Sequence, residues 1–109
     1  MATTYKVLGQ SNPAATTATT LYTVPSATQA VVSTIVIANL TATAAQFRIA
    51  VRVAGATLAN SQYVAYDITV GASDSTALTL GLTLGAADVV TVYASTANIT
   101  FTAFGSEIA

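Results

Sequence analysis

The chain of 109 residues contains no cysteine, no histidine and no tryptophan, and only 6% of its residues are charged. It therefore lacks the commonest general base, the thiolate nucleophile and the usual zinc ligands. The lack of cysteine also excludes a disulfide framework. Because these absences exclude most hydrolase chemistry, we expect a protein that is not an enzyme and that holds no cofactor or metal ion.

The few charges are scattered, and the net charge is −1. Three cationic residues cannot form the basic stripe that neutralises several phosphates, so we expect no nucleic-acid partner. The most apolar run, residues 30–40, is about half the length of the ~20-residue helix that spans a bilayer. The N-terminus lacks the apolar segment of a secretory signal peptide. We therefore expect no membrane partner.

Carboxylates are the remaining source of acid–base or metal chemistry. A paired-carboxylate glycosidase site is one alternative, and a calcium site built from Asp and carbonyl oxygens is another. However, the four acidic residues lie on different predicted elements, and no calcium-loop motif is present. In "GASDST" and "GAADVV" we expect Asp74 and Asp88 to accept hydrogen bonds from backbone donors of turns.

After an Ala/Thr-rich beginning, β-branched and aromatic residues recur in short runs separated by Gly, Pro, Asn, Asp and Ser. This pattern is typical of strands. We predict seven strands, at residues 21–24, 30–39, 46–53, 62–70, 75–84, 88–95 and 98–104. Residues 5–9 form either an eighth strand or part of an arm.

Alternation with period two predicts which side chains face the core. The predicted inward sets are Leu78, Leu80, Leu82 and Leu84; Phe47, Ile49, Val51 and Val53; Val64, Tyr66, Ile68 and Val70; and Ile99 with Phe101. Short strands at this spacing favour an all-β, antiparallel β-sandwich, jelly-roll-like, with seven or eight strands. We expect one sandwich domain at residues 21–109 and an extended N-terminal arm at residues 1–20.

The low charge also predicts assembly. An ordinary soluble domain has about 25% charged residues, and a net charge near zero promotes association. With a mean hydropathy of +0.66 and no membrane segment, much of the outer surface is expected to be covered by other subunits. The interface candidates are Tyr5, Arg48, Arg52, Tyr63, Asp67, Tyr93 and Phe104.

Arg48 and Arg52 lie in the strand "QFRIAVRV", where burial of the apolar set turns both guanidinium groups outward. A regular hairpin would place Arg48 opposite Asp67 as an ion pair and Arg52 opposite Tyr63 as a cation–π pair. The alternatives are two solubilising arginines, a contact between subunits, or capture of a phosphate or another ligand.

The ordered series "YKVLGQ", "LYTVP", "VVSTIVIAN", "FRIAVR", "YVAYD", "DSTALTLGLTL", "DVVTVYAS" and "FTAFGSEI" spans nearly the whole chain. It resembles a family of small virion structural proteins of tailed bacteriophages, including cyanophages, and of prophages. The resemblance implies a virion location after assembly in the host bacterial cytoplasm. It carries over no catalytic residue.

Taken with the composition, this resemblance implies a capsid decoration (cement) protein that stabilises the shell as a multi-copy component. A homo-oligomer, with a trimer favoured, would bind the major capsid protein or other virion proteins. A component of the tail, neck, baseplate or fibre is an alternative, and so is a subunit of a bacterial surface filament. A carbohydrate-binding decoration would require exposed aromatic rings in a shallow groove.

Overall fold

The computed structural model describes residues 2–109, and these residues form eight β-strands and two short 3-10 turns. The turns are Val53–Gly55 and Asn60–Gln62. The strands are β1 (Thr3–Ser11), β2 (Thr19–Thr23), β3 (Gln29–Asn39), β4 (Ala45–Arg52), β5 (Tyr63–Val70), β6 (Ser75–Leu84), β7 (Val89–Ala94) and β8 (Ile99–Ile108). The seven predicted strands are therefore confirmed, with small shifts at their ends.

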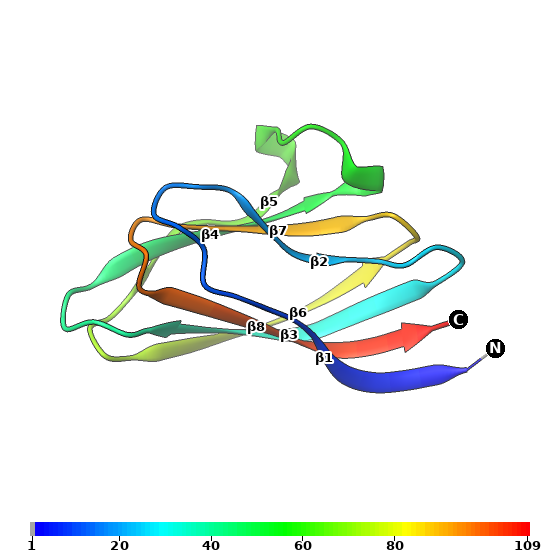
Figure 1. Cartoon of the computed structure of the whole chain (residues 1–109), viewed down its shortest axis with the longest axis horizontal. Helices are drawn as coiled ribbons and strands as arrows, with labels where there is room; N and C mark the ends of the chain where they lie inside the picture. The colour runs from blue at the N-terminus through cyan, green and yellow to red at the C-terminus, as the bar shows by residue number, and fades with distance from the viewer. Residues whose placement is uncertain (1) are drawn as a thin grey trace.

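The strands form two antiparallel sheets that pack face to face (Figure 1). One sheet has the order β1-β8-β3-β6, and the other has the order β2-β7-β4-β5. Strands that follow one another in the chain mostly lie in different sheets, and only β4 and β5 are joined within one sheet. The predicted antiparallel sandwich is thus confirmed.

The core lies between the sheets and consists of aliphatic and aromatic side chains. The largest fully buried ones are Phe47, Phe101, Ile35, Ile37, Ile49 and Ile99. Phe47 on β4 meets Phe101 on β8 edge to face, with ring centroids 6.1 Å apart, and so joins the two sheets. This is a favourable arrangement for aromatic quadrupoles. Ile99 and Phe101 therefore face inward, as predicted.

The N-terminal segment does not form an extended arm over residues 3–11. These residues form β1, an edge strand that pairs with β8 from Thr3↔Ile108 to Ser11↔Phe101. The interpretation of residues 5–9 as an eighth strand is therefore correct. Pairing with β8 satisfies backbone groups that an arm would leave to solvent. Met1 lies outside the described residues.

Strand β5 departs from simple alternation because it contains two bulges. Phe47 pairs with Ile68, but Ile49 pairs with Ala65 and Ala50 with Tyr63, so β5 gains a residue at each step. An extra residue reverses the alternation of the side chains that follow it. Ala65 is consequently buried.

The prediction that four residues of β5 and the end of β4 face the core is therefore wrong for Val64, Tyr66, Ile68 and Val53, which are exposed. Val64 and Tyr66 were predicted to face the core, and both are exposed. Ile68 lies opposite the buried Phe47, but its side chain is 36% exposed because β5 is an edge strand. Val53 is exposed because β4 ends at Arg52 and the chain turns there.

Gly105 lies on β8 where the backbone of β3 is close. A Cβ atom at this position would lie 1.9 Å from the carbonyl oxygen of Val31, which is backbone and cannot rotate away. Strands β3 and β8 pair along their full lengths, so they cannot separate locally at low cost. The close approach therefore requires a residue without a side chain.

We predict that Gly105→Ala lowers the free energy of unfolding by about 3 kcal/mol, because the added methyl group must displace β3. Chemical denaturation monitored by circular dichroism measures this change. Gly71→Ala is the matched control, because its Cβ would meet Asp74 only at ordinary contact distances of 3.6 and 3.7 Å. Equal stabilities of the two variants would contradict the prediction.

Candidate functional site

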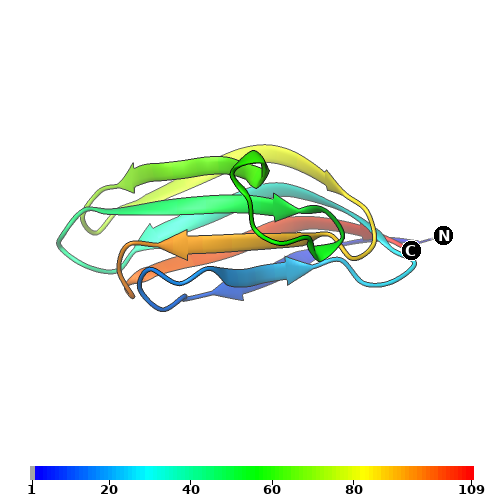
Figure 2. The same ribbon diagram turned by 90° about the horizontal axis from the view of Figure 1, so that it is seen from above.

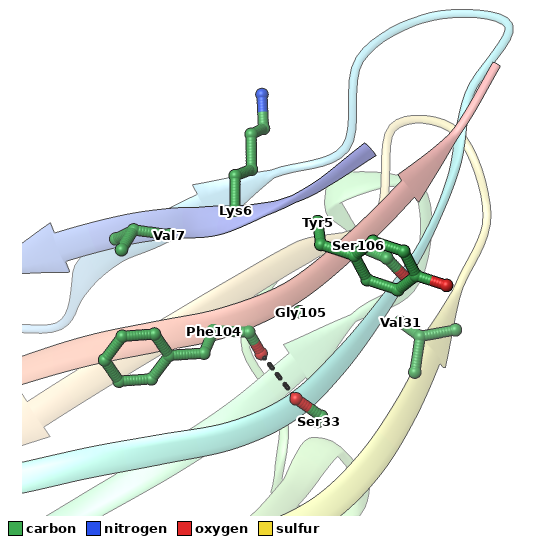
Figure 3. Close-up of a pocket in the computed structure, with 8 residues that line it drawn as sticks. All are labelled: Tyr5, Lys6, Val7, Val31, Ser33, Phe104, Gly105 and Ser106. Carbon is green, nitrogen blue, oxygen red and sulfur yellow. Dashed lines mark hydrogen bonds between the residues drawn. The ribbon is translucent and has the colours of Figure 1, made fainter. Parts of the chain in front are cut away.

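An apolar hollow lies on the outer face of the β1-β8-β3-β6 sheet (Figure 3). Its volume is about 490 Å³, and it is lined by Tyr5, Lys6, Val7, Val31, Ser33, Phe104, Gly105 and Ser106. The side chains of Tyr5, Val7 and Phe104 are exposed, and Tyr5 is 83% exposed. Three large apolar side chains thus gather on one open surface.

Strand alternation and bulges place these side chains together. Tyr5 and Val7 are two residues apart on β1, so both point outward, and Phe104 pairs with Val7 from β8. β1 has a bulge between Val7 and Gly9, and β3 has one between Val32 and Thr34. The extra residue in β3 is Ser33, whose hydroxyl donates to the Phe104 carbonyl at 3.1 Å. Bulges bend strands, and here they lie beside the hollow.

The hollow is nearly free of charge. Lys6 contributes to its lining, but the Lys6 side chain points away from Tyr5 and Phe104 (Figure 3). The Lys6 ammonium pairs with Glu107 at 2.9 Å instead. The polar groups left at the hollow are hydroxyls and backbone atoms, so it fits an apolar side chain better than an anion.

Glu107 links three strands at one end of the sandwich. Its carboxylate pairs with Lys6 of β1 and accepts a hydrogen bond of 2.5 Å from the hydroxyl of Tyr22 on β2. Hydrogen bonds from Tyr22 and Lys6 hold the pKa of Glu107 below its usual value. Burial, followed by the hydrogen bond to Glu107, raises the pKa of Tyr22. This network ties the two sheets together, and it was not predicted from the sequence.

A second cluster lies on the outer face of the β2-β7-β4-β5 sheet. The Arg48 Nε atom donates to Asp67 at 2.7 Å, which confirms the predicted ion pair. The guanidinium carbon also lies 4.2 Å from the ring centroid of Tyr66 and 4.3 Å from that of Tyr93. The hydrogen bond to Asp67 is the main reason that the pKa of Arg48 is raised. The Nε and Nη2 atoms of Arg48 are thus engaged by Asp67, and the guanidinium lies against two tyrosine rings of its own chain.

The bulge in β5 assembles this cluster. Both Tyr66 and Asp67 lie between the residues that pair with Phe47 and Ile49, so both lie across from Arg48. Asp67 has a φ of +51°, a left-handed conformation that Asp tolerates better than most residues. Tyr66 was predicted to be a core residue, and this is wrong because the bulge turns it to the outer face.

Arg52 does not contact Tyr63 as predicted. The bulges move the register by two residues, so Ala50 lies opposite Tyr63. The Arg52 guanidinium donates instead to the carbonyl oxygens of Ala56 at 2.7 Å and Gly55 at 2.8 Å. Arg52 therefore closes the loop that follows β4. In both arginines, Nε and Nη2 already donate to groups of the same chain.

The turn roles predicted for two acidic residues are confirmed. Asp88 accepts hydrogen bonds from the backbone N–H groups of Gly85 at 2.9 Å and Ala54 at 2.8 Å. Asp74 accepts one from Ser75 at 2.8 Å. Within residues 2–109, no three His, Cys, Asp or Glu side chains are grouped so that they could hold a metal ion.

The predicted interface residues separate into two surfaces. Tyr5 and Phe104 lie together at the hollow, whereas Arg48, Asp67 and Tyr93 lie together on the other sheet. Tyr63 adjoins the second group, with its ring 4.9 Å from that of Tyr66. Sequence reasoning missed Val7 and Ser33. The spacing of Tyr5 and Val7 was a usable signal for Val7, but nothing in the sequence marks the bulge at Ser33.

Comparison with known protein families and with curated protein sequences finds no match to this chain. Among residues 2–109, no helix is both long enough and apolar enough to cross a membrane. The hollow around Tyr5 and Phe104 and the cluster around Arg48 are therefore the features on which function is argued.

We predict that Glu107→Gln lowers the melting temperature Tm at pH 7, with an effect that disappears in acid. A carboxylate whose pKa is lowered by folding stabilises the protein above its unfolded pKa of about 4.3. This contribution is lost as the pH falls through the lower folded pKa, where Glu107 becomes neutral like glutamine. Thermal unfolding across acidic and neutral pH tests this, and an equal difference in Tm at both ends would contradict it.

We predict that Asp67→Asn lowers Tm at low ionic strength, because it removes the charge that Arg48 faces. The effect should shrink as salt is added, since the pair is partly exposed and therefore screened. Arg48→Lys is the comparison variant. It keeps the positive charge but loses the planar group stacked on two tyrosines, so its effect should depend less on salt. An unchanged Tm for Asp67→Asn at low salt would be the contrary result.

Proposed function

We propose that this chain is a structural protein of a bacteriophage virion, not an enzyme, and that it acts as a capsid decoration protein that stabilises the shell in many copies. The observation that carries the proposal is the apolar hollow on an outer sheet face that has almost no charge. A surface of this kind is suited to permanent contact with another protein.

The lining of the hollow defines the chemistry of its partner. Tyr5 and Phe104 offer two aromatic rings. Val7, which pairs with Phe104 across the two strands, offers an aliphatic side chain. Full burial of such a side chain contributes roughly 1.5–3 kcal/mol. The only charged lining residue, Lys6, is already paired with Glu107. The partner is therefore a virion protein that inserts a neutral, apolar side chain, and the major capsid protein is the one we propose.

The strand order supports the same proposal. Eight strands in the orders β1-β8-β3-β6 and β2-β7-β4-β5, with connections that cross between the sheets, match two interlocked Greek keys. We infer a jelly-roll-like arrangement, an architecture that is common in viral capsid and lectin domains. Because folds host many functions, this order supports the proposal but does not carry it.

The location of the protein is tested by electron microscopy of particles from the host cultures that produce it, with antibody labelling of the chain. We expect label on the capsid shell. Label on the tail, neck, baseplate or fibre would replace the decoration role with a tail or fibre role. Particles without label would overturn the virion proposal.

The hollow is tested by adding purified protein to particles that lack it. We predict that Tyr5→Ser combined with Phe104→Ser weakens binding at least tenfold, since each ring contributes more than about 1.4 kcal/mol when it is buried. Leu40→Ser is the matched control. Leu40 is 63% exposed but is not part of the hollow, so this variant should bind like the wild type. Equal binding by all three proteins would contradict the assignment of the hollow.

A further inference from the structure

The two lateral sides of the sandwich differ in how they are closed. Strands β1 and β2 form one side, and strands β5 and β6 form the other (Figure 2). On the first side, β1 packs so closely on β2 that a Cβ atom at Gly9 would lie 2.1 Å from the Leu21 carbonyl oxygen. Tyr22 also crosses from one sheet to Glu107 on the other. This side is therefore sealed within the chain.

The β5/β6 side is open. Leu78, Leu80 and Leu82 point from β6 towards the core but are only partly buried. Ile68 on β5 also stays 36% exposed, although it lies opposite the buried Phe47. Fully buried leucines would be expected in a sandwich that closed both sides, since each buried methylene group contributes about 0.8 kcal/mol. An apolar row is left along this side.

The free edge of β6 lacks two of the protections that natural edge strands usually carry, which are charged residues and proline. Its sequence, "STALTLGLTL", has no charged residue and no proline. Its register with β3 is regular from Ser75 to Thr79 and is interrupted only afterwards, near Gly81. The edge strand β1 carries Lys6, by contrast. Lysine, proline and bulges are the features that prevent edge-to-edge pairing, so β6 is protected along only part of its length.

The hydrogen-bond pattern shows which backbone groups are free at this edge. The Asn39 N–H donates to the Asp74 carbonyl at 2.9 Å, so Asn39 and Asp74 are a hydrogen-bonded pair between the chain segments of β3 and β6. Paired residues in an antiparallel ladder alternate between bonded and non-bonded. The N–H and C=O groups of Ala77 and Thr79 therefore point away from β3. Ser75 is oriented in the same way, but its N–H already donates to the Asp74 carboxylate at 2.8 Å. The side chains of these three residues are small or only moderately sized, which lets another strand approach.

We propose that β6 pairs in antiparallel fashion with β6 of a second copy of this chain, joining two four-stranded sheets into one of eight strands. This inference rests on the proposed assembly function and names the contact between copies, whereas the hollow is the contact with the shell. An identical neutral strand brings no like charges together. Its leucine row would cover the leucine row of the first copy, as a two-fold contact requires.

The test is the molar mass of the purified protein in solution, measured by sedimentation over a wide range of concentration. We expect twice the chain mass of 11.0 kDa for the wild type. Ala77→Pro should halve this mass. It removes an outward N–H group at the edge and breaks no bond to β3.

Thr3→Pro is the matched control on the opposite edge of the same sheet. Ala2 and Ala109 exchange both of their backbone hydrogen bonds, so the alternation leaves the N–H of Thr3 pointing outward from β1. This variant should keep the doubled mass. Circular dichroism checks that each variant retains its strands. If Ala77→Pro loses them, Ala77→Lys decides the question, since it adds a charge at the same edge and should also halve the mass.

A wild-type mass equal to one chain, or to three chains as the predicted trimer requires, would overturn the β6 pairing. So would a doubled mass in a folded variant of Ala77. These outcomes are separate from the test of the proposed function. A single-chain protein that still binds particles through Tyr5 and Phe104 would remove the pairing alone, and a β6 dimer that binds no particles would remove the decoration role alone.

Discussion

In a strand that has one face in the core, each inserted residue reverses the sides on which the following residues lie. This constraint decides which side chains β5 exposes. In β5, insertions move Tyr66 out of the core and bring Ala65 into it. In β1 and β3, bulges lie beside the apolar hollow that collects Tyr5, Val7 and Phe104. The backbone irregularities are thus the places where the surface acquires its chemistry.

The few charges are mostly used inside the chain. Arg48 is paired with Asp67 and lies against two tyrosine rings, Lys6 is paired with Glu107, and Arg52 binds loop carbonyls. Asp88 accepts hydrogen bonds from turn backbone. A protein that uses its charges in this way has little left for solvation or for long-range attraction. The contacts proposed above therefore depend on apolar area and on backbone groups.

Both proposed contacts lie on one of the two sheets. The outer face of the β1-β8-β3-β6 sheet carries the hollow, and the same sheet ends at the open edge of β6. Because the outer face and the edge point in different directions, the proposed shell partner and the proposed second copy do not compete for the same surface. The opposite sheet contains the self-satisfied Arg48 cluster, which stabilises the chain without needing a partner.

The sequence by itself determined the fold class and most strand positions, because period-two patterns such as "LTLGLTL" depend only on neighbouring residues. It also determined the Arg48–Asp67 pair, because Asp67 directly follows the regular register from Ala45↔Val70 to Phe47↔Ile68 and still lies across from Arg48 at the first bulge. Only the tertiary structure decided the positions of Tyr66 and Arg52, the Tyr22–Glu107 link and the hollow. Bulges depend on the fit between neighbouring strands, and contacts such as that of Tyr22 with Glu107 join residues that are distant in the chain. Local patterns contain neither kind of information.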